Sequence, residues 1–220
     1  MDKTAIILGA SGATGKEVLK ILLEDHRYSE IKLFTRSSIN LTHPKIKEYI
    51  TDLFELENLK SDFTADEVYC CIGTTKAKTP DKEVYKKIDY GIPVTAARLC
   101  KENNIKTYIV ISAIGANINS SVFYSRTKGE MQQAVLENGI LNTHILQPSL
   151  ILAERNDKRI GEKIASGIMW LLNPLLFGNA ARYKSISAKD IAKAMVWLCN
   201  NPYPDQIIQS HTIEEIADKP

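Results

Sequence analysis

The chain has 220 residues, of which 25% are charged and 44% hydrophobic, and its formal net charge is +2. This length suits one large domain with a substantial core, so residues 1–220 are expected to fold as a single unit. The composition argues against disorder, and the nearly balanced net charge gives no sign of a nucleic-acid-binding surface.

The first residues, Met1-Asp2-Lys3-Thr4, lead directly into an apolar run and leave no room for a secretory signal. No segment approaches the roughly 18 apolar residues that span a bilayer. The most apolar segment, 164–177, is interrupted by Asn173-Pro174. We therefore expect a cytoplasmic protein without stable membrane insertion.

Four cysteines and four histidines lack the spacing of a metal site. Cys70 and Cys71 are adjacent in the apolar run 68–72, which is typical of a buried strand. Cys100, Cys199 and the histidines occur singly. Reduced thiols with packing roles, and no bound metal, are expected.

A buried strand over residues 5–8 and a helix over 16–23 are joined by three glycines. Gly9 would make the tight turn, Gly12 would let the backbone approach a pyrophosphate, and Gly15 would let the helix pack against the strand. The spacing differs from GxGxxG, but the strand–turn–helix context favours a dinucleotide phosphate over an ordinary turn. The other turn residues assigned to the cofactor are Ser11, Ala13 and Thr14.

Strand-like runs alternate with helical patterns along most of the chain, which predicts βαβ units with right-handed crossovers. The fold class is therefore α/β, with a doubly wound parallel sheet. Ser187 is expected to cap the last helix, with Asp190 at its third position. The further expected strands are 31–35, 67–72, 108–112 and 143–147, and the further expected helices are 82–103, 122–137 and 188–199.

The chain after Pro148 is less regular. Proline has no N–H for a ladder bond, so the strand 143–147 should end there. Residues 150–183 are interpreted as a small excursion on the substrate side that carries an apolar helix over 164–172. That helix could belong to the core, act as a lid or form a surface for a partner.

Arg36 and Ser37 follow the strand 31–35, whose end lies beside the adenosine ribose in doubly wound folds. A carboxylate there would accept a hydrogen bond from the ribose 2′-hydroxyl, whereas an arginine suits a 2′-phosphate. NADP(H) is therefore favoured over NAD(H), the alternative being that Arg36 is a solvated loop residue.

Secondary cofactor signals come from Asp52, Gly73 and Thr74. Asp52 could meet the adenine, or it could cap a helix that begins at Leu53. Gly73 follows the strand 67–72, and its lack of a side chain would allow close backbone contact with the dinucleotide. Thr74 beside it is assigned to the same contact.

Tyr124 and Lys128 form the candidate catalytic pair at the start of the helix 122–137. A spacing of four puts both on one helix face, where the ammonium could lower the pKa of the phenol. Such a phenol could exchange a proton with a substrate oxygen while a hydride moves to or from nicotinamide. Ser112, at the end of strand 108–112, could hydrogen-bond the same oxygen. The same spacing recurs at Tyr28 and Lys32, but no helix aligns them and a structural role is expected.

Together these residues resemble an atypical short-chain dehydrogenase/reductase, similar to the branch of the Tat-interacting oxidoreductase. The resemblance covers nearly the whole chain and implies a Rossmann core, NADP(H) and a Ser-Tyr-Lys set of Ser112, Tyr124 and Lys128, with Lys128 also contacting the ribose. It further implies that residues 146–150 pass beside the nicotinamide. The residues that carry it are the glycine turn, Arg36, 71–75, Ser112, Tyr124, 128–130, Gln147, Pro148 and Ser149.

Two departures from the family pattern stand out. Asp89 occupies a position where better-studied members often have an asparagine that supports a proton relay. The excursion after Pro148 leaves little wall for a nucleotide sugar, which argues against an epimerase.

The leading interpretation is an NADP(H)-dependent oxidoreductase acting on a small or medium carbonyl or alcohol substrate. The alternative is an NADP(H)-binding regulatory or sensor protein with little turnover, which would have no use for an aligned phenol. A homodimer or a regulatory protein partner is compatible with either interpretation.

Overall fold

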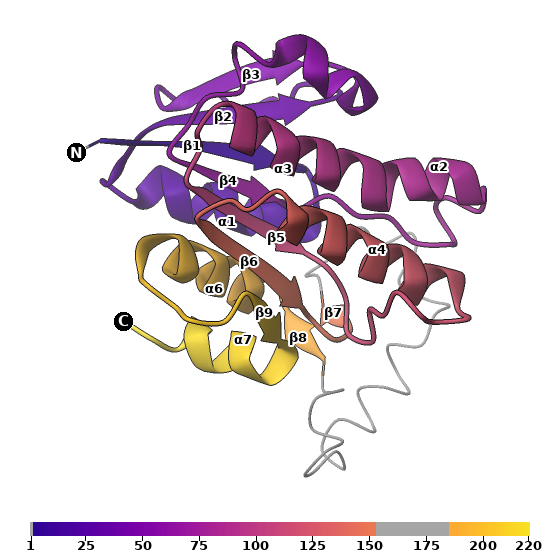
Figure 1. Ribbon diagram of the computed structural model, residues 1–220. Coiled ribbons are helices and arrows are strands. Elements are labelled where there is room, and N and C mark those ends of the chain that lie inside the picture. The colour runs from indigo at the N-terminus through magenta and orange to yellow at the C-terminus, as the bar shows by residue number, and fades with distance from the viewer. Residues whose placement is uncertain (1, 153–184) are drawn as a thin grey trace.

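The computed structural model describes residues 2–152 and 185–220. A fully parallel sheet of seven strands lies at its centre, with the order β3-β2-β1-β4-β5-β6-β9. The α/β, doubly wound fold expected from the sequence is confirmed (Figure 1). The strands are β1 (Lys3–Leu8), β2 (Tyr28–Thr35), β3 (Ile46–Ile50), β4 (Glu67–Cys70), β5 (Thr107–Ile111), β6 (Asn142–Gln147) and β9 (Ile207–Gln209).

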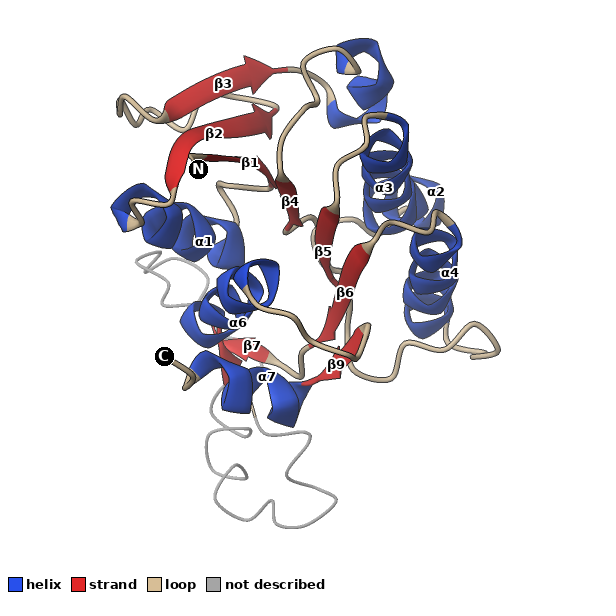
Figure 2. Cartoon of the chain, turned by 60° about the vertical axis from the view of Figure 1, so that its left-hand side comes forward, coloured by secondary structure: helices blue, strands red, loops and turns tan. Residues whose placement is uncertain are grey.

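Helices cover both faces of this sheet. Figure 2 shows α1, α6 and α7 on one face and α3 and α4 on the other. A separate pair of short strands, β7 (Ile151–Leu152) and β8 (Ile186–Ser187), lies beyond the sheet. The helices are α1 (Ala13–Glu24), the 3-10 helix η1 (Leu53–Leu59), α2 (Lys82–Lys86), the π-helix η2 (Lys87–Gly91), α3 (Ile92–Glu102), α4 (Phe123–Glu137), α6 (Ala188–Asn200) and α7 (Ser210–Ala217).

The hydrophobic core has two parts, one on each face of the sheet. Successive side chains of a strand point to opposite faces, so β1 contributes Ile7 to one part and Ile6 and Leu8 to the other. All three are fully buried. Burial on both faces explains why the central strands read as continuous apolar runs rather than as alternating patterns.

The helix expected over 82–103 follows that course but is interrupted by η2. There the Ile92 N–H donates to the carbonyl oxygen of Lys87, five residues earlier. Pro93 gives the physical reason, because proline has no N–H and its ring would collide with the carbonyl of Asp89, four residues before it. The π turn, in which hydrogen bonds join residues five apart, relieves this conflict.

Two expected helix caps are confirmed. The Asp52 side chain accepts a hydrogen bond from the Phe54 N–H at 3.0 Å, and the Ser187 side chain accepts one from the Asp190 N–H at 3.0 Å. Most of the expected excursion 150–183, including the apolar helix 164–172 and the wider segment 164–177, lies outside the described residues. Among the helices that are described, none has the length and apolarity to cross a membrane.

Candidate functional site

The residues expected to bind a cofactor gather at one edge of the sheet. All seven strands are parallel, so the segments that follow their carboxyl ends meet there. The strand order reverses between β1 and β4, which makes this point the usual place for a ligand crevice. The residues brought to this edge are Gly9, Arg36, Ser37, Asp52, Gly73, Thr74, Ser112, Gln147, Pro148 and Ser149.

The first and third glycines of the turn between β1 and α1 are required by the fold itself. Gly9 has a φ of +86°, and a Cβ there would lie 2.9 Å from the carbonyl oxygen of Cys71. A Cβ on Gly15 would lie 2.1 Å from the Gly9 carbonyl oxygen. Any side chain at either position would therefore push α1 away from β1 and β4.

Gly12 is different, because the backbone does not demand glycine there. Its φ of −77° and ψ of 170° suit any residue, and a Cβ would meet only the Gly9 carbonyl oxygen, at 3.2 Å. The Gly12 N–H donates to that same oxygen at 2.9 Å. The missing side chain thus keeps space open in front of α1, as close approach of a pyrophosphate requires.

The N-terminus of α1 is suited to an anion. Helices leave their first N–H groups without intrahelical partners, and these carry partial positive charge. No side chain caps α1, and its first turn holds no acidic residue. Side chains of Asp52, Asp81 and Ser187 cap η1, α2 and α6, whereas α3, α4 and α7 resemble α1 in having no side-chain cap. The free donors of α1 fit a phosphate group.

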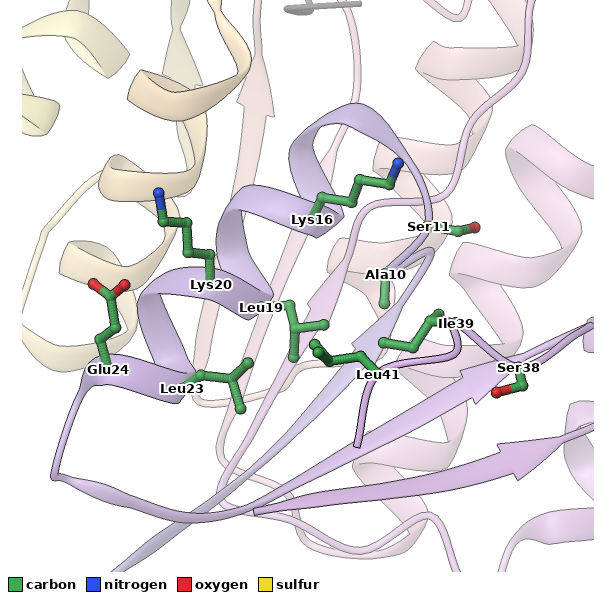
Figure 3. A pocket seen from close by; sticks show the side chains of 10 residues that line it. All are labelled: Ala10, Ser11, Lys16, Leu19, Lys20, Leu23, Glu24, Ser38, Ile39 and Leu41. Atoms are coloured by element: carbon green, nitrogen blue, oxygen red, sulfur yellow. The ribbon is translucent and has the colours of Figure 1, made fainter. Parts of the chain in front are cut away.

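A cavity of about 500 Å³ adjoins this turn, between α1 and the chain that follows β2 (Figure 3). Lys16 and Lys20 lie one helical turn apart on its rim, and the Lys16 side chain extends toward the turn that carries Ser11. Arg36 lies two residues before Ser38 on the opposite wall and is exposed, with no ion pair to any described residue. The inner wall is apolar and consists of Ala10, Leu19, Leu23, Ile39 and Leu41.

Lys128 is held in a buried ion pair with Asp89. Its Nζ lies 2.8 Å from Asp89 Oδ1, and the two side chains are 3% and 1% exposed. Asp89 also accepts a hydrogen bond from the Thr74 N–H at 2.8 Å. A Cβ on Gly73 would lie 3.9 Å from the Lys128 ammonium, so this ammonium lies beside the backbone assigned to the dinucleotide.

Tyr124 does not have the environment expected from its spacing to Lys128. The pKa of Tyr124 is raised to about 12, first by partial burial and then by the negative charge of Asp89, against the nearby Tyr85 hydroxyl, which lowers it. The expected lowering of this pKa is therefore wrong. The main physical reason is the burial of the phenol, and the ammonium of Lys128 is paired with Asp89.

Ser112 is positioned by a hydrogen-bonded series of glutamine side chains. Its hydroxyl accepts a hydrogen bond from Gln132 Nε2 at 2.6 Å, and the Gln132 oxygen accepts one from Gln147 Nε2 at 3.1 Å. The residue is only 4% exposed. Among the described residues, no hydrogen bond joins Ser112 or Lys128 to Tyr124.

The loop between β5 and α4 fixes the start of that helix. The Asn117 N–H donates to the Ser125 carbonyl oxygen at 3.0 Å, and Arg126 Nη1 donates to the Ser120 carbonyl oxygen at 2.8 Å. A Cβ on Gly129 would lie 2.3 Å from the Ile118 nitrogen, so glycine lets the loop lie directly on the helix. This packing determines where Tyr124, 39% exposed, is presented.

Gln132 and Tyr85 were not expected from the sequence as members of the site, and Asp89 was noted only as a departure at the position of the family's relay asparagine. The last two are four residues apart within the expected helix 82–103, and that spacing was the available signal. The structural role expected for Tyr28 and Lys32 is confirmed, since Tyr28 hydrogen-bonds to Glu67 and Lys32 donates to main-chain carbonyls.

Comparison with known proteins agrees with this geometry. Residues 9–202 match a family described as NAD(P)H-binding. Protein FMP52, mitochondrial, of Candida albicans is 32% identical over 88% of this chain and 86% of its own length. Protein HTATIP2 of Rattus norvegicus is 29% identical over 74% of this chain and 69% of its own. The Bordetella bronchiseptica enzyme WbmH in complex with NAD+ has a TM-score of 0.69, 15% identity, and coverage of 99% of this chain and 80% of its own.

These relatives confirm the expected family and contradict the expected cytoplasmic location. The expected cytoplasmic location conflicts with the names of the FMP52 relatives from four fungi, each of which is called mitochondrial. The absence of a secretory signal from the first residues was therefore an insufficient basis for that expectation.

Proposed function

The chain belongs to the NAD(P)H-binding family, and from that premise we propose that it is an NADP(H)-dependent oxidoreductase of the short-chain dehydrogenase/reductase type. Its substrate would be a small or medium carbonyl compound, or the matching alcohol. The observation that carries the proposal is the meeting of three features at the β1/β4 crevice: the uncapped α1, the bare backbone at Gly73 and the ammonium of Lys128.

Different residues at this edge would bind different parts of the cofactor. The turn from Gly9 to Gly15, with Ser11, Ala13 and Thr14, would hold the pyrophosphate, and Arg36 with Ser37 would hold the 2′-phosphate. Asp52 would lie near the adenine. Bound NADP(H) supplies or accepts the hydride. The residues proposed for the ribose and nicotinamide end are Gly73, Thr74, Lys128, Gln147, Pro148 and Ser149.

Tyr124 would act as the general acid in carbonyl reduction. With a pKa of about 12 the phenol is protonated at neutral pH and can donate to a developing alkoxide. Ser112, held by Gln132, would hydrogen-bond the same substrate oxygen. Lys128 would contact the ribose and balance the charge of Asp89.

A second function, NADP(H)-responsive regulation without turnover, is favoured by one observation. The Lys128 ammonium is paired with Asp89, and the pKa of Tyr124 is raised rather than lowered. A protein that only senses the cofactor needs the glycine turn and Arg36 but not an activated phenol.

Tyr124→Phe separates the two functions. A panel of carbonyl compounds is first screened with NADPH by nicotinamide absorbance. On the best substrate, Tyr124→Phe should lower kcat by about 10²–10⁴-fold, as expected for loss of general acid catalysis, with NADPH affinity nearly unchanged. Tyr203→Phe is the matched control, because Tyr203 packs against His144 and Trp197, outside the site. Undiminished turnover in Tyr124→Phe would refute the catalytic role, and a panel without any substrate would favour regulation.

A further inference from the structure

Two helical segments that pack together each contribute a pair of side chains at a spacing of four. Tyr85 and Asp89 come from the path α2–η2, and Tyr124 and Lys128 come from α4. Figure 1 shows the path α2–η2–α3 lying along α4, and residues of η2 and α4 are in contact. The pairs face each other so that the tyrosines meet and the aspartate meets the lysine.

Tyr85 is the member of this group that has no assigned role. It is 3% exposed, and its ring meets the Tyr124 ring edge-on, with centroids 5.8 Å apart and an interplanar angle of 68°. Its hydroxyl is buried and has no hydrogen-bond partner among the described residues. An unpartnered buried hydroxyl is unfavourable and calls for an explanation.

Among the described residues, the other buried side-chain polar atom without a hydrogen bond is Asp89 Oδ1, which contacts Lys128 as an ion pair. Asp89 lies one helical turn from Tyr85 on the same path, and the Tyr124 ring meets the Tyr85 ring, so both residues are neighbours of Tyr85. Of the other charges on these facing surfaces, Lys86 and Glu130 are paired with each other at 2.8 Å. They do not compete for the Tyr85 hydroxyl.

We propose that Tyr85 is a positioning residue for Tyr124: its hydroxyl, without a partner while Tyr124 is neutral, donates a hydrogen bond to the Tyr124 oxygen once that phenol has lost its proton. This inference rests on the proposed function. In carbonyl reduction the hydride adds to the carbonyl carbon, and the π pair moves to the oxygen. That oxygen takes the Tyr124 proton, which leaves a phenolate. Tyr85 keeps its own proton throughout.

The electrostatics of the group support this role. Burial, followed by the charge of Asp89, raises the pKa of Tyr85, so its hydroxyl remains a donor over the whole working range. A phenolate at Tyr124 would lie near the carboxylate of Asp89, whose charge raises the pKa of Tyr124. A charge-assisted hydrogen bond from Tyr85 to the phenolate would offset this repulsion.

The test measures the ionisation of residue 124 directly and needs no substrate. Tyr124 is replaced by 2,3,5-trifluorotyrosine, whose phenol is much more acidic than tyrosine, so that it titrates where the protein is folded. Its pKa is followed by fluorine NMR. Tyr85→Phe should raise this pKa by about one unit, a ten-fold loss of acidity. Tyr90→Phe, on the same helical path with its ring under Lys86, should leave it unchanged.

An unchanged pKa in a Tyr85→Phe protein with native circular dichroism would overturn the inference. Phenylalanine keeps the ring and removes only a hydroxyl without a partner, so the variant should fold. In the active enzyme that carries trifluorotyrosine at position 124, Tyr85→Phe should also shift the alkaline limb of the pH profile of kcat toward higher pH, which a purely structural role would not do. If no carbonyl substrate is turned over, the proposed function fails while the NMR result still decides the role of Tyr85.

Discussion

Arg36 is the residue on which the proposed preference for NADP(H) over NAD(H) rests. It follows β2 directly, is exposed, and forms no ion pair with any described residue, so its guanidinium is free to meet a ligand. Guanidinium groups bind phosphate with two parallel, charge-assisted hydrogen bonds. NADH has a hydroxyl where NADPH has the 2′-phosphate, and it gives Arg36 no such partner.

Arg36→Ala should therefore weaken NADPH binding by about ten-fold or more, which corresponds to about 1.5–3 kcal/mol for hydrogen bonds to a charged group. NADH binding should barely change. Arg27→Ala is the control, because Arg27 lies just before the other end of β2 and pairs with Asp25. Calorimetric titration measures both affinities. Equal losses for the two cofactors would contradict the role of Arg36.

Sequence spacing could not predict which partner a charged side chain of the site would have. The spacing of Tyr124 and Lys128 on one helix was readable, but the choice of Lys128 between Tyr124 and Asp89 depends on how two helices pack. Tyr85 was missed for the same reason, since its contact with Tyr124 joins segments 39 residues apart in the sequence. Local patterns report one element at a time.

At the scale of elements, the glycine turn and α1 form a unit whose three glycines have different duties. Backbone packing demands glycine at positions 9 and 15, whereas Gly12 is the glycine that is proposed to face the pyrophosphate. A substitution at Gly12 should thus separate cofactor binding from folding, which substitutions at the other two cannot do.

Gly12→Val should fold and lose affinity for NADPH and NADH together, by at least about ten-fold, since a branched side chain would occupy the approach of the pyrophosphate. Gly91→Ala is the control: its φ of −60° is helical, and an added Cβ meets nothing nearer than 4.0 Å. Fluorescence titration with both cofactors and thermal unfolding provide the measurements. Retained affinity in folded Gly12→Val would place the site elsewhere.

The elements that the sequence predicted well are those with a single strong pattern. The buried strands β1, β2, β5 and β6 and the capped α6 were placed within a few residues. The strand β3 was missed because it is a partly exposed edge strand with charges at Lys47 and Glu48, and β9 has only three residues. The π turn before Pro93 was missed because the apolar periodicity continues through it.

At the scale of the whole molecule, the amino ends of the strands hold a polar network that is separate from the candidate site. The carboxylate of Glu67, 1% exposed, accepts hydrogen bonds from Tyr28, from Tyr69 at 2.7 Å and from Lys3 at 3.2 Å. Asn200 adds α6 to this network through a 2.7 Å hydrogen bond to Tyr28. One buried carboxylate thus joins β1, β2, β4 and α6 at the edge opposite the crevice.

Glu67→Gln should destabilise the protein by about 1.5–3 kcal/mol, because it removes the charge from these hydrogen bonds while keeping the shape of the side chain. Glu30→Gln, which changes a partly exposed carboxylate 3.7 Å from the Lys32 ammonium, should cost well under about 1 kcal/mol. Urea unfolding measures both. NADPH affinity should be the same in the two variants, and a selective loss in Glu67→Gln would show that the two edges are coupled.

The π turn η2 affects how this site can change in evolution. It sets the rotational phase of α2 relative to α3, and a regular α-helix advances about 100° per residue. Deleting one residue from η2 would turn the whole of α2 by about that angle and carry Tyr85 away from Tyr124. The helix beyond Pro93 would keep its place in the core. Deletion of a single codon would therefore replace Tyr85 with a different neighbour of Tyr124, although every other side chain is retained.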